Sequence, residues 1–303
     1  MKTPVRYLFM LICLFASGTL YAQTISQSAK RVLFLGNSIT YAGQYINYIE
    51  TYWLLKHPGQ HLEFINMGLP SETVSGLSEE GHADGKFPRP DLHERLNRIM
   101  KLVQPDVVFA CYGMNDGIYQ PFDEDRFNRF KTGIEWLHDQ YAGQGVRIIH
   151  LTPPVYDEEK GGAKGYAAVL DRYSDWLLAQ RKALKWEVAD LHYPMKKVLD
   201  AGTHLAGDGV HPGNEGHWIM AKAVLLYLGE KKVAKANDIT TAINNPKTTD
   251  ILKLVSQRQA IMKDAWLTAA GHKRPMTPGL PLAEAQEKAK VLDQQIKDVL
   301  KRE

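Results

Sequence analysis

Short apolar runs alternate with longer amphipathic segments from residue 31 to about residue 229. The apolar runs, such as RVLFLG and DVVFACY, are rich in aliphatic and β-branched residues, which is typical of strands buried on both faces. They predict strands at 31–36, 61–66, 106–112, 146–151 and, for a shorter fifth one, 186–189. Between them apolar residues recur every three or four positions, which predicts helices at 42–56, 91–103, 123–141, 165–184 and 214–228.

Strands that alternate with helices indicate a mostly parallel, five-stranded sheet covered by helices on both faces, the three-layer α/β/α class. In such sheets ligands bind beyond the carboxyl ends of the strands. The pattern changes after about residue 235. Apolar positions then predict a helix at 249–270, a proline-bearing turn and a second helix at 282–300. We interpret 236–303 as a helical hairpin with Trp266 as its anchor. It either packs on the core domain or binds a partner or second copy.

The first 22 residues have a different pattern. Lys2 and Arg6 precede an apolar run at 7–16, and Ala22 offers a small residue before Gln23. This pattern is typical of a secretory signal peptide. The run is shorter than the roughly 20 residues that span a bilayer, so we expect cleavage rather than a membrane anchor. The expected organisation is a signal peptide at 1–22, a main α/β domain at 23–235 and a helical extension at 236–303, with a periplasmic or extracellular location.

Composition limits the possible partners. Without Lys2 and Arg6 the formal charge falls from +3 to +1, so neither nucleic acid nor an anionic membrane surface is expected. Cys111 is the one cysteine outside the signal segment, and we expect it in the core. The histidines lack metal-ligand spacing, and we expect no metal and no cofactor.

Four polar motifs lie at the predicted carboxyl ends of strands or just before the last helix of the core domain. They are Gly36-Asn37-Ser38, Asn66-Met67-Gly68, Gly113-Met114-Asn115-Asp116 and Asp208-Gly209-Val210-His211. Each is ordinary when taken alone. A serine after a strand is commonly a helix N-cap, Asn-Asp-Gly is common in turns, and an Asp–His pair is compatible with a metal or surface site.

In this order the four motifs resemble those of the SGNH hydrolases, also called the GDSL family, over residues 31–228. The resemblance implies a flavodoxin-like SGNH hydrolase fold. It also implies Ser38 as nucleophile, His211 as base and Asp208 as the acid that orients it. The oxyanion hole would consist of the N–H groups of Ser38 and Gly68 and the side chain of Asn115. Asn37 stands where the family often has aspartate.

A long polar segment, 69–90, follows the second motif. Loops of this length are often functional. We therefore consider Glu72, His82 and Arg89 as substrate-binding candidates, together with Tyr112 and Tyr119, which flank the Asn115 motif.

These features predict a secreted serine esterase that works through an acyl-enzyme. We favour a carbohydrate O-acetyl esterase acting on a polysaccharide, because the signal peptide and the polar, aromatic surroundings of the site suit a polar extracellular ester. The alternatives are a lysophospholipase or a general short-chain acyl esterase. Another class also stays open, a non-catalytic carbohydrate-binding module with a helical interaction tail.

Overall fold

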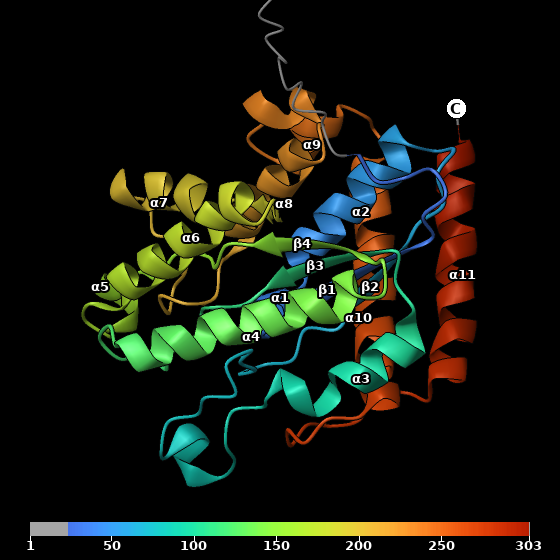
Figure 1. The fold of residues 1–303 in the computed structure, drawn as a ribbon. Coiled ribbons are helices and arrows are strands. Elements are labelled where there is room, and N and C mark those ends of the chain that lie inside the picture. Colours follow the sequence, from blue (N-terminus) through green and yellow to red (C-terminus); the bar gives the residue numbers. More distant parts are fainter. Residues whose placement is uncertain (1–23, 303) are drawn as a thin grey trace, which may run out of the picture.

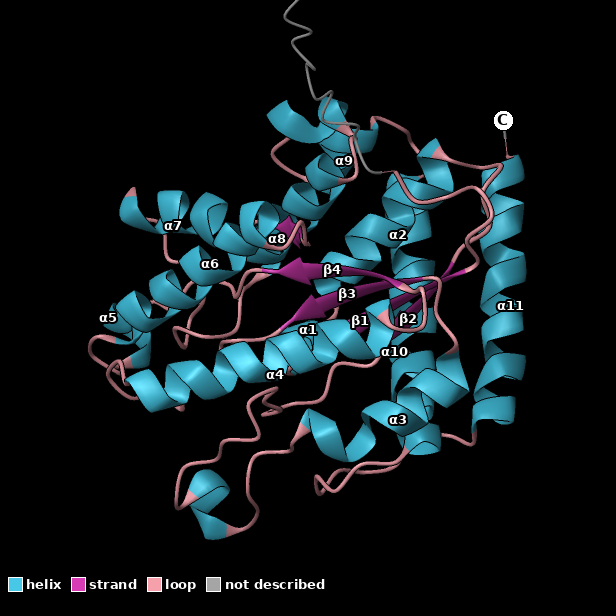
Figure 2. Cartoon of the chain, in the orientation of Figure 1, coloured by secondary structure: helices cyan, strands magenta, loops and turns pink. Residues whose placement is uncertain are grey.

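The computed structural model describes residues 24–302, so the predicted signal peptide lies outside the described residues. A five-stranded, fully parallel sheet forms the centre of the molecule (Figures 1 and 2), and the strand order is β2-β1-β3-β4-β5. The strands are β1 (Arg31–Gly36), β2 (Glu63–Asn66), β3 (Val107–Cys111), β4 (Arg147–Leu151) and β5 (Glu187–Ala189). The predicted three-layer α/β/α fold is confirmed.

Helices cover both faces of this sheet. They include α2 (Gln44–Lys56), α3 (Leu92–Val103), α4 (Glu124–Ala142), α6 (Tyr166–Ala183) and α8 (Asn214–Tyr227). Right-handed crossovers place α2 on one face and α3, α4 and α6 on the other. In Figure 1, α4 crosses in front of the sheet, and α8 packs against α2.

The register aligns the carboxyl ends of the three strands that precede the first three motifs. Phe34 pairs with Asn66, and Gly36 pairs with Cys111. The segments after β1, β2 and β3 therefore leave the sheet at the same edge. This alignment brings together motifs that lie up to about 80 residues apart in the sequence.

The start of the first helix differs from the prediction. Helix α1 (Ser38–Ala42) begins directly after β1, and Gly43 separates it from α2. Gly43 has a φ of 75°, and a Cβ there would lie 2.7 Å from Nδ2 of Asn66. The backbone therefore turns at Gly43, where only glycine is unstrained. The short helices α5 (Glu158–Gly161), α7 (His192–Asp200) and α9 (Ile239–Ile243) were not predicted, because few apolar repeats fit in so few residues.

The C-terminal hairpin packs against the domain. Helix α10 (Thr248–Ala270) contacts α2, α3 and β2, and α11 (Leu282–Lys301) lies along α10 (Figure 1). Trp266 is buried in the main core, and the amide of Gln259 donates to the carbonyl oxygen of Phe64 at the sheet edge over 2.8 Å. Of the alternatives for the hairpin, packing on the core is the one seen for α10.

No helix within residues 24–302 has both the length and the apolarity needed to cross a bilayer.

Cys111 is buried in β3, and burial raises the pKa of its thiol to about 12, as expected for a core cysteine.

Candidate active site

Ser38 occupies the first position of α1, immediately after the turn that ends β1. The N-cap is Asn37, whose side-chain oxygen accepts the N–H of Ile39 over 3.1 Å. Asparagine is as good an N-cap as aspartate, which accounts for the residue in place of the common aspartate. Because Asn37 makes the cap, the hydroxyl of Ser38 is left available for another partner.

That partner is His211. The Oγ of Ser38 lies 2.8 Å from Nε2 of His211, and Nδ1 of His211 lies 2.6 Å from a carboxylate oxygen of Asp208. The other carboxylate oxygen of Asp208 accepts the N–H groups of Val210 and His211 over 2.9 and 2.8 Å. The three predicted residues therefore form one hydrogen-bonded triad at the end of β1.

Asp208 stays ionised in this setting. Partial burial would raise its pKa, but hydrogen bonds from the backbone and ring of His211 and from the N–H of Val210 outweigh this and lower it to about 2. An ionised carboxylate at Nδ1 holds the imidazole in the tautomer that leaves Nε2 free to accept a proton. Nε2 therefore faces the hydroxyl of Ser38 as a proton acceptor.

Asn115 lies beyond β3 and is almost fully buried. Its side-chain nitrogen donates to the carbonyl oxygen of Glu72 over 3.1 Å, and its side-chain oxygen accepts the hydroxyl of Tyr119 over 3.1 Å. An amide nitrogen carries two hydrogens, so within residues 24–302 one N–H of Asn115 remains for a ligand. The neighbouring Asp116 ties this loop to residues 74–75, because its carboxylate accepts the N–H groups of Gly113, Val74 and Ser75.

The predicted oxyanion role of Gly68 needs correction. Its single N–H donates to the side-chain oxygen of Asn66 over 2.9 Å and is already in use. The glycine is instead required by packing, because a Cβ there would lie 2.3 Å from the backbone nitrogen of Tyr41. Gly68 therefore allows the segment after β2 to touch α1.

Ser71, three residues later, offers a backbone N–H that the four motifs did not indicate. It lies in a turn closed by the N–H of Glu72 and the carbonyl oxygen of Leu69, 3.2 Å apart, and it has a φ of 67°. Proline at the second position and a positive φ at the third are the marks of a type II turn, so Pro70 was the available signal. Within residues 24–302 the N–H of Ser71 makes no hydrogen bond. It adjoins Glu72, whose carbonyl holds Asn115.

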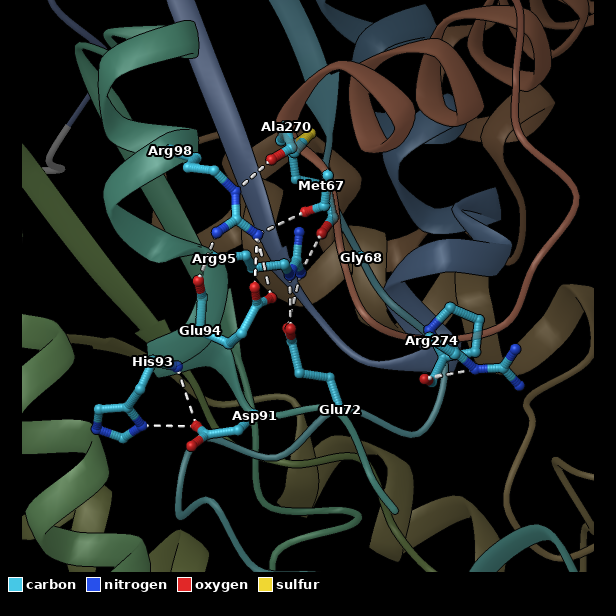
Figure 3. A network of polar contacts seen from close by, with 12 residues as sticks. Met67, Gly68, Glu72, Asp91, His93, Glu94, Arg95, Arg98, Ala270 and Arg274 are labelled. Carbon is cyan, nitrogen blue, oxygen red and sulfur yellow. Dashed lines mark hydrogen bonds and ion pairs between the residues drawn. The ribbon is translucent and has the colours of Figure 1, made fainter. Parts of the chain in front are cut away.

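Glu72 and Tyr112 do not face the substrate side. Both are essentially inaccessible to solvent. The carboxylate of Glu72 pairs with Arg95 over 2.6 and 2.7 Å (Figure 3). It also accepts the hydroxyl of Tyr112 over 2.7 Å. Arg95 also donates to the carbonyl oxygen of Met67 over 2.8 Å. The prediction that Glu72 and Tyr112 contact substrate is therefore replaced by a supporting role beneath the site.

Of the other three substrate-binding candidates, Arg89 is buried, whereas His82 and Tyr119 are partly exposed. Arg89 pairs with Glu79 over 2.6 Å, and its guanidinium lies 5.3 Å from the ring centre of Tyr119. His82 bonds to the same Glu79 over 3.3 Å. Their contact with substrate stays a prediction. No group of three or more His, Cys, Asp or Glu side chains within 24–302 is arranged to hold a metal ion.

Known structures share this fold. An acetylxylan esterase from Geobacillus stearothermophilus, solved as a catalytic mutant, is 22% identical with a TM-score of 0.54, and the match covers 68% of this chain and 96% of that one. LAE5, a hydrolase from the metagenome of Lake Arreo, Spain, is 22% identical with a TM-score of 0.54, covering 68% and 98%. A gut microbial diltiazem-metabolizing enzyme is 22% identical with a TM-score of 0.54, and the match spans 69% of this chain but only 49% of that one.

At these identities the structures show the common fold alone. No curated protein sequence matches the chain significantly. The family comparison is more specific, because the GDSL-like Lipase/Acylhydrolase family matches residues 34–219, which is more than half of the chain and includes every residue of the triad. The chain belongs to the GDSL-like lipase/acylhydrolase family and is an ester-cleaving hydrolase with the SGNH fold.

Proposed function

We propose that this esterase removes acetyl groups from a carbohydrate outside the cytoplasm, through an acyl-enzyme on Ser38. The observation that carries the proposal is the triad, with Oγ of Ser38 2.8 Å from Nε2 of His211 and Nδ1 2.6 Å from Asp208. A serine hydroxyl attacks an ester only when a base accepts its proton. His211 is in place to accept that proton and then to pass it to the departing alcohol.

The attack converts the ester carbonyl oxygen into an oxyanion, which needs donors. The N–H of Ser38 lies at the first position of α1, where an N–H has no intrahelical acceptor. The remaining N–H of Asn115 and the unpaired N–H of Ser71 supply the other two donors in this proposal. Losing one such donor typically lowers kcat by about 10²–10³-fold. Water then attacks the acyl-enzyme, with His211 again accepting the proton.

The substrate proposal rests on two kinds of support. Structures with the same fold include an acetylxylan esterase. Segment 69–90 and the Asn115 loop also carry the partly exposed polar and aromatic side chains of His82 and Tyr119, and such groups suit a sugar better than an acyl chain. A lysophospholipase or short-chain esterase is the competing proposal within the same chemistry.

Labelling with a fluorophosphonate tests the nucleophile. The probe should attach to Ser38 in the wild-type protein and fail to attach in Ser38→Ala, and a Ser26→Ala control should label normally. Acetate release from acetylated xylo-oligosaccharides should disappear in Ser38→Ala alone. If Ser38→Ala still reacts, another nucleophile acts. If the wild-type protein does not react, the binding-module alternative gains support.

The structure of the labelled protein tests the donors. The phosphoryl oxygen of the adduct should lie within about 3.1 Å of the backbone nitrogens of Ser38 and Ser71 and of the amide of Asn115. A rotated Asn66 side chain, with the N–H of Gly68 on the phosphoryl oxygen, would restore Gly68 to the role that the motif predicted. Substrate chain length separates the competing esterases: acetyl sugars should be preferred over phospholipids and over long-chain p-nitrophenyl esters.

A further inference from the structure

The C-terminal hairpin reaches the active site, although it lies outside the family match at 34–219. Its contact point is Tyr41, three residues after Ser38 in α1. The hydroxyl of Tyr41 donates to Asp264 of α10 over 2.8 Å, and the ammonium of Lys263 donates to the carbonyl oxygen of Tyr41 over 3.1 Å. The helix that carries the nucleophile is therefore held directly by α10.

Arg274, in the connection between α10 and α11, continues this contact onto the turn at Ser71. Its Nε donates to the carbonyl oxygen of Pro70 over 3.0 Å (Figure 3), and its Nη1 donates to the carbonyl oxygen of Pro275 over 3.2 Å. Its guanidinium also lies 5.0 Å from the ring centre of Phe87. Arg274 thus lies where segment 69–90 meets the hairpin, one residue from the proposed oxyanion donor.

The charge of Arg274 has no acidic partner in the described part of the chain. Within residues 24–302 no carboxylate lies at ion-pair distance from its guanidinium, and its Nη2 makes no hydrogen bond. In Figure 3 the two terminal nitrogens of Arg274 lie on the side of the guanidinium that faces away from the oxygen joined to it by the dashed line. Two other cations of this region have partners. Arg89 pairs with Glu79, and the ammonium of Lys263 contacts the ring and the carbonyl oxygen of Tyr41.

A half-buried guanidinium without a counter-ion is unfavourable, because burial removes water from the charge and no partner takes the place of that water. Burial accordingly lowers the pKa of Arg274. Nη1 uses one of its two hydrogens on Pro275, so one N–H of Nη1 and the N–H groups of Nη2 remain, and this edge has the spacing that binds both oxygens of a carboxylate. One guanidinium edge fits a monoanion.

We propose that Arg274 binds a carboxylate of the substrate, so that the preferred substrate is an acetylated acidic saccharide containing a uronic acid. This inference rests on the proposed carbohydrate esterase function and specifies its substrate class. Ser38 and His211 act on the acetyl ester, and Arg274 holds the carboxylate on the same or a neighbouring sugar. The competing explanation is that Arg274 only fastens the α10–α11 connection to Pro70.

The test compares acetylated oligogalacturonate with its methyl ester, which has the same sugars without the charge. Acetylated xylo-oligosaccharide and p-nitrophenyl acetate serve as neutral substrates. The proteins are the wild type, Arg274→Met, Arg274→Lys and the control Arg31→Met, which removes an arginine at the opposite end of β1. Kinetics give kcat and KM separately, and thermal unfolding checks that each variant folds.

The wild type should prefer the acid over its methyl ester by about 10–100-fold in kcat/KM, the range expected for hydrogen bonds to a charged group. Arg274→Met should remove this preference by raising KM for the acid alone, Arg274→Lys should keep part of it, and Arg31→Met should keep all of it. Raised salt should weaken binding of the acid only.

Three results would overturn the inference. The wild type could treat acid and methyl ester alike, or Arg274→Met could reduce activity on all substrates equally, as the fastening role requires. In both cases cleavage of the neutral saccharide would leave the carbohydrate function standing. The third result is cleavage of p-nitrophenyl acetate with no saccharide deacetylated, which would reject the carbohydrate function and the inference together.

Discussion

The triad and the polar groups beneath it are held in opposite ways. His211 and Asp208 have side chains that are 49% and 56% exposed, and they are aligned by a spacing of three residues and by backbone N–H groups. Glu72 and Arg95 are 0% and 1% exposed and are aligned by a paired ionic contact enclosed in the core. The reacting groups are open to substrate, and the supporting groups are closed to water.

This difference in exposure indicates that the triad serves catalysis and the buried pair serves folding. A group that must meet a substrate cannot be surrounded by protein, so its replacement should affect catalysis more than folding. A buried charge is tolerated only while its partner is present, so its replacement should affect folding first. The following predictions test this division, from the largest expected effect to the smallest.

Asp208→Asn should lower kcat by about 10³–10⁴-fold, because the amide no longer stabilises the required tautomer and the charged imidazole. The free energy of unfolding should change by less than about 1 kcal/mol, since the pair is exposed. Esterase kinetics and denaturant unfolding measure the two effects. Asp91→Asn is the matched control, because Asp91 forms a similar exposed pair with His93 at 2.7 Å. A large loss of stability in Asp208→Asn would show that the exposed triad also stabilises the fold, contrary to the proposed division.

Glu72→Ala should destabilise the protein by about 3–5 kcal/mol, because it leaves the buried guanidinium of Arg95 without a counter-charge. Glu94→Ala is the matched control, because Glu94 lies on α3, the helix that carries Arg95. It breaks the partly exposed pair with Arg98 at 2.9 Å and should cost about 1 kcal/mol or less. Urea unfolding of the two variants measures the difference. Equal costs would mean that burial does not distinguish these two pairs.

Acid should destabilise the protein through His150, a second buried group. Burial, helped by His138, lowers the pKa of His150 to about 3 from 6.5. The unfolded chain therefore binds a proton between these values while the folded protein does not, and stability falls as pH falls from 6.5 towards about 3. The expected slope from this residue is about 1.4 kcal/mol per pH unit.

Unfolding free energies at several pH values in this window should show that slope reduced in His150→Gln, because glutamine does not titrate. Parallel curves for wild type and variant would show that another group causes the acid sensitivity.

Much of the fold was predictable because its causes are local. The apolar runs gave all five strands, with the first strand matching at 31–36 and the others differing by one or two residues at their ends. Parallel strands buried on both faces carry continuous apolar sequence, which is a strong signal. The break at Gly43 was missed because it depends on the close approach of Asn66, and no local pattern reports such an approach.

The site divides in the same manner. The sequence by itself determined which residues lie at the ends of the strands, because the motifs follow the apolar runs directly. It also placed Asp208 and His211 within reach of each other through their spacing. Only the tertiary structure decided which atoms are free to act. Among residues 24–302 it leaves the N–H of Ser71 unpaired, encloses Glu72 with Arg95, and brings Arg274 to the carbonyl oxygen of Pro70. Hydrogen-bond partners and burial are set by segments far apart in the chain, and a motif contains no record of them.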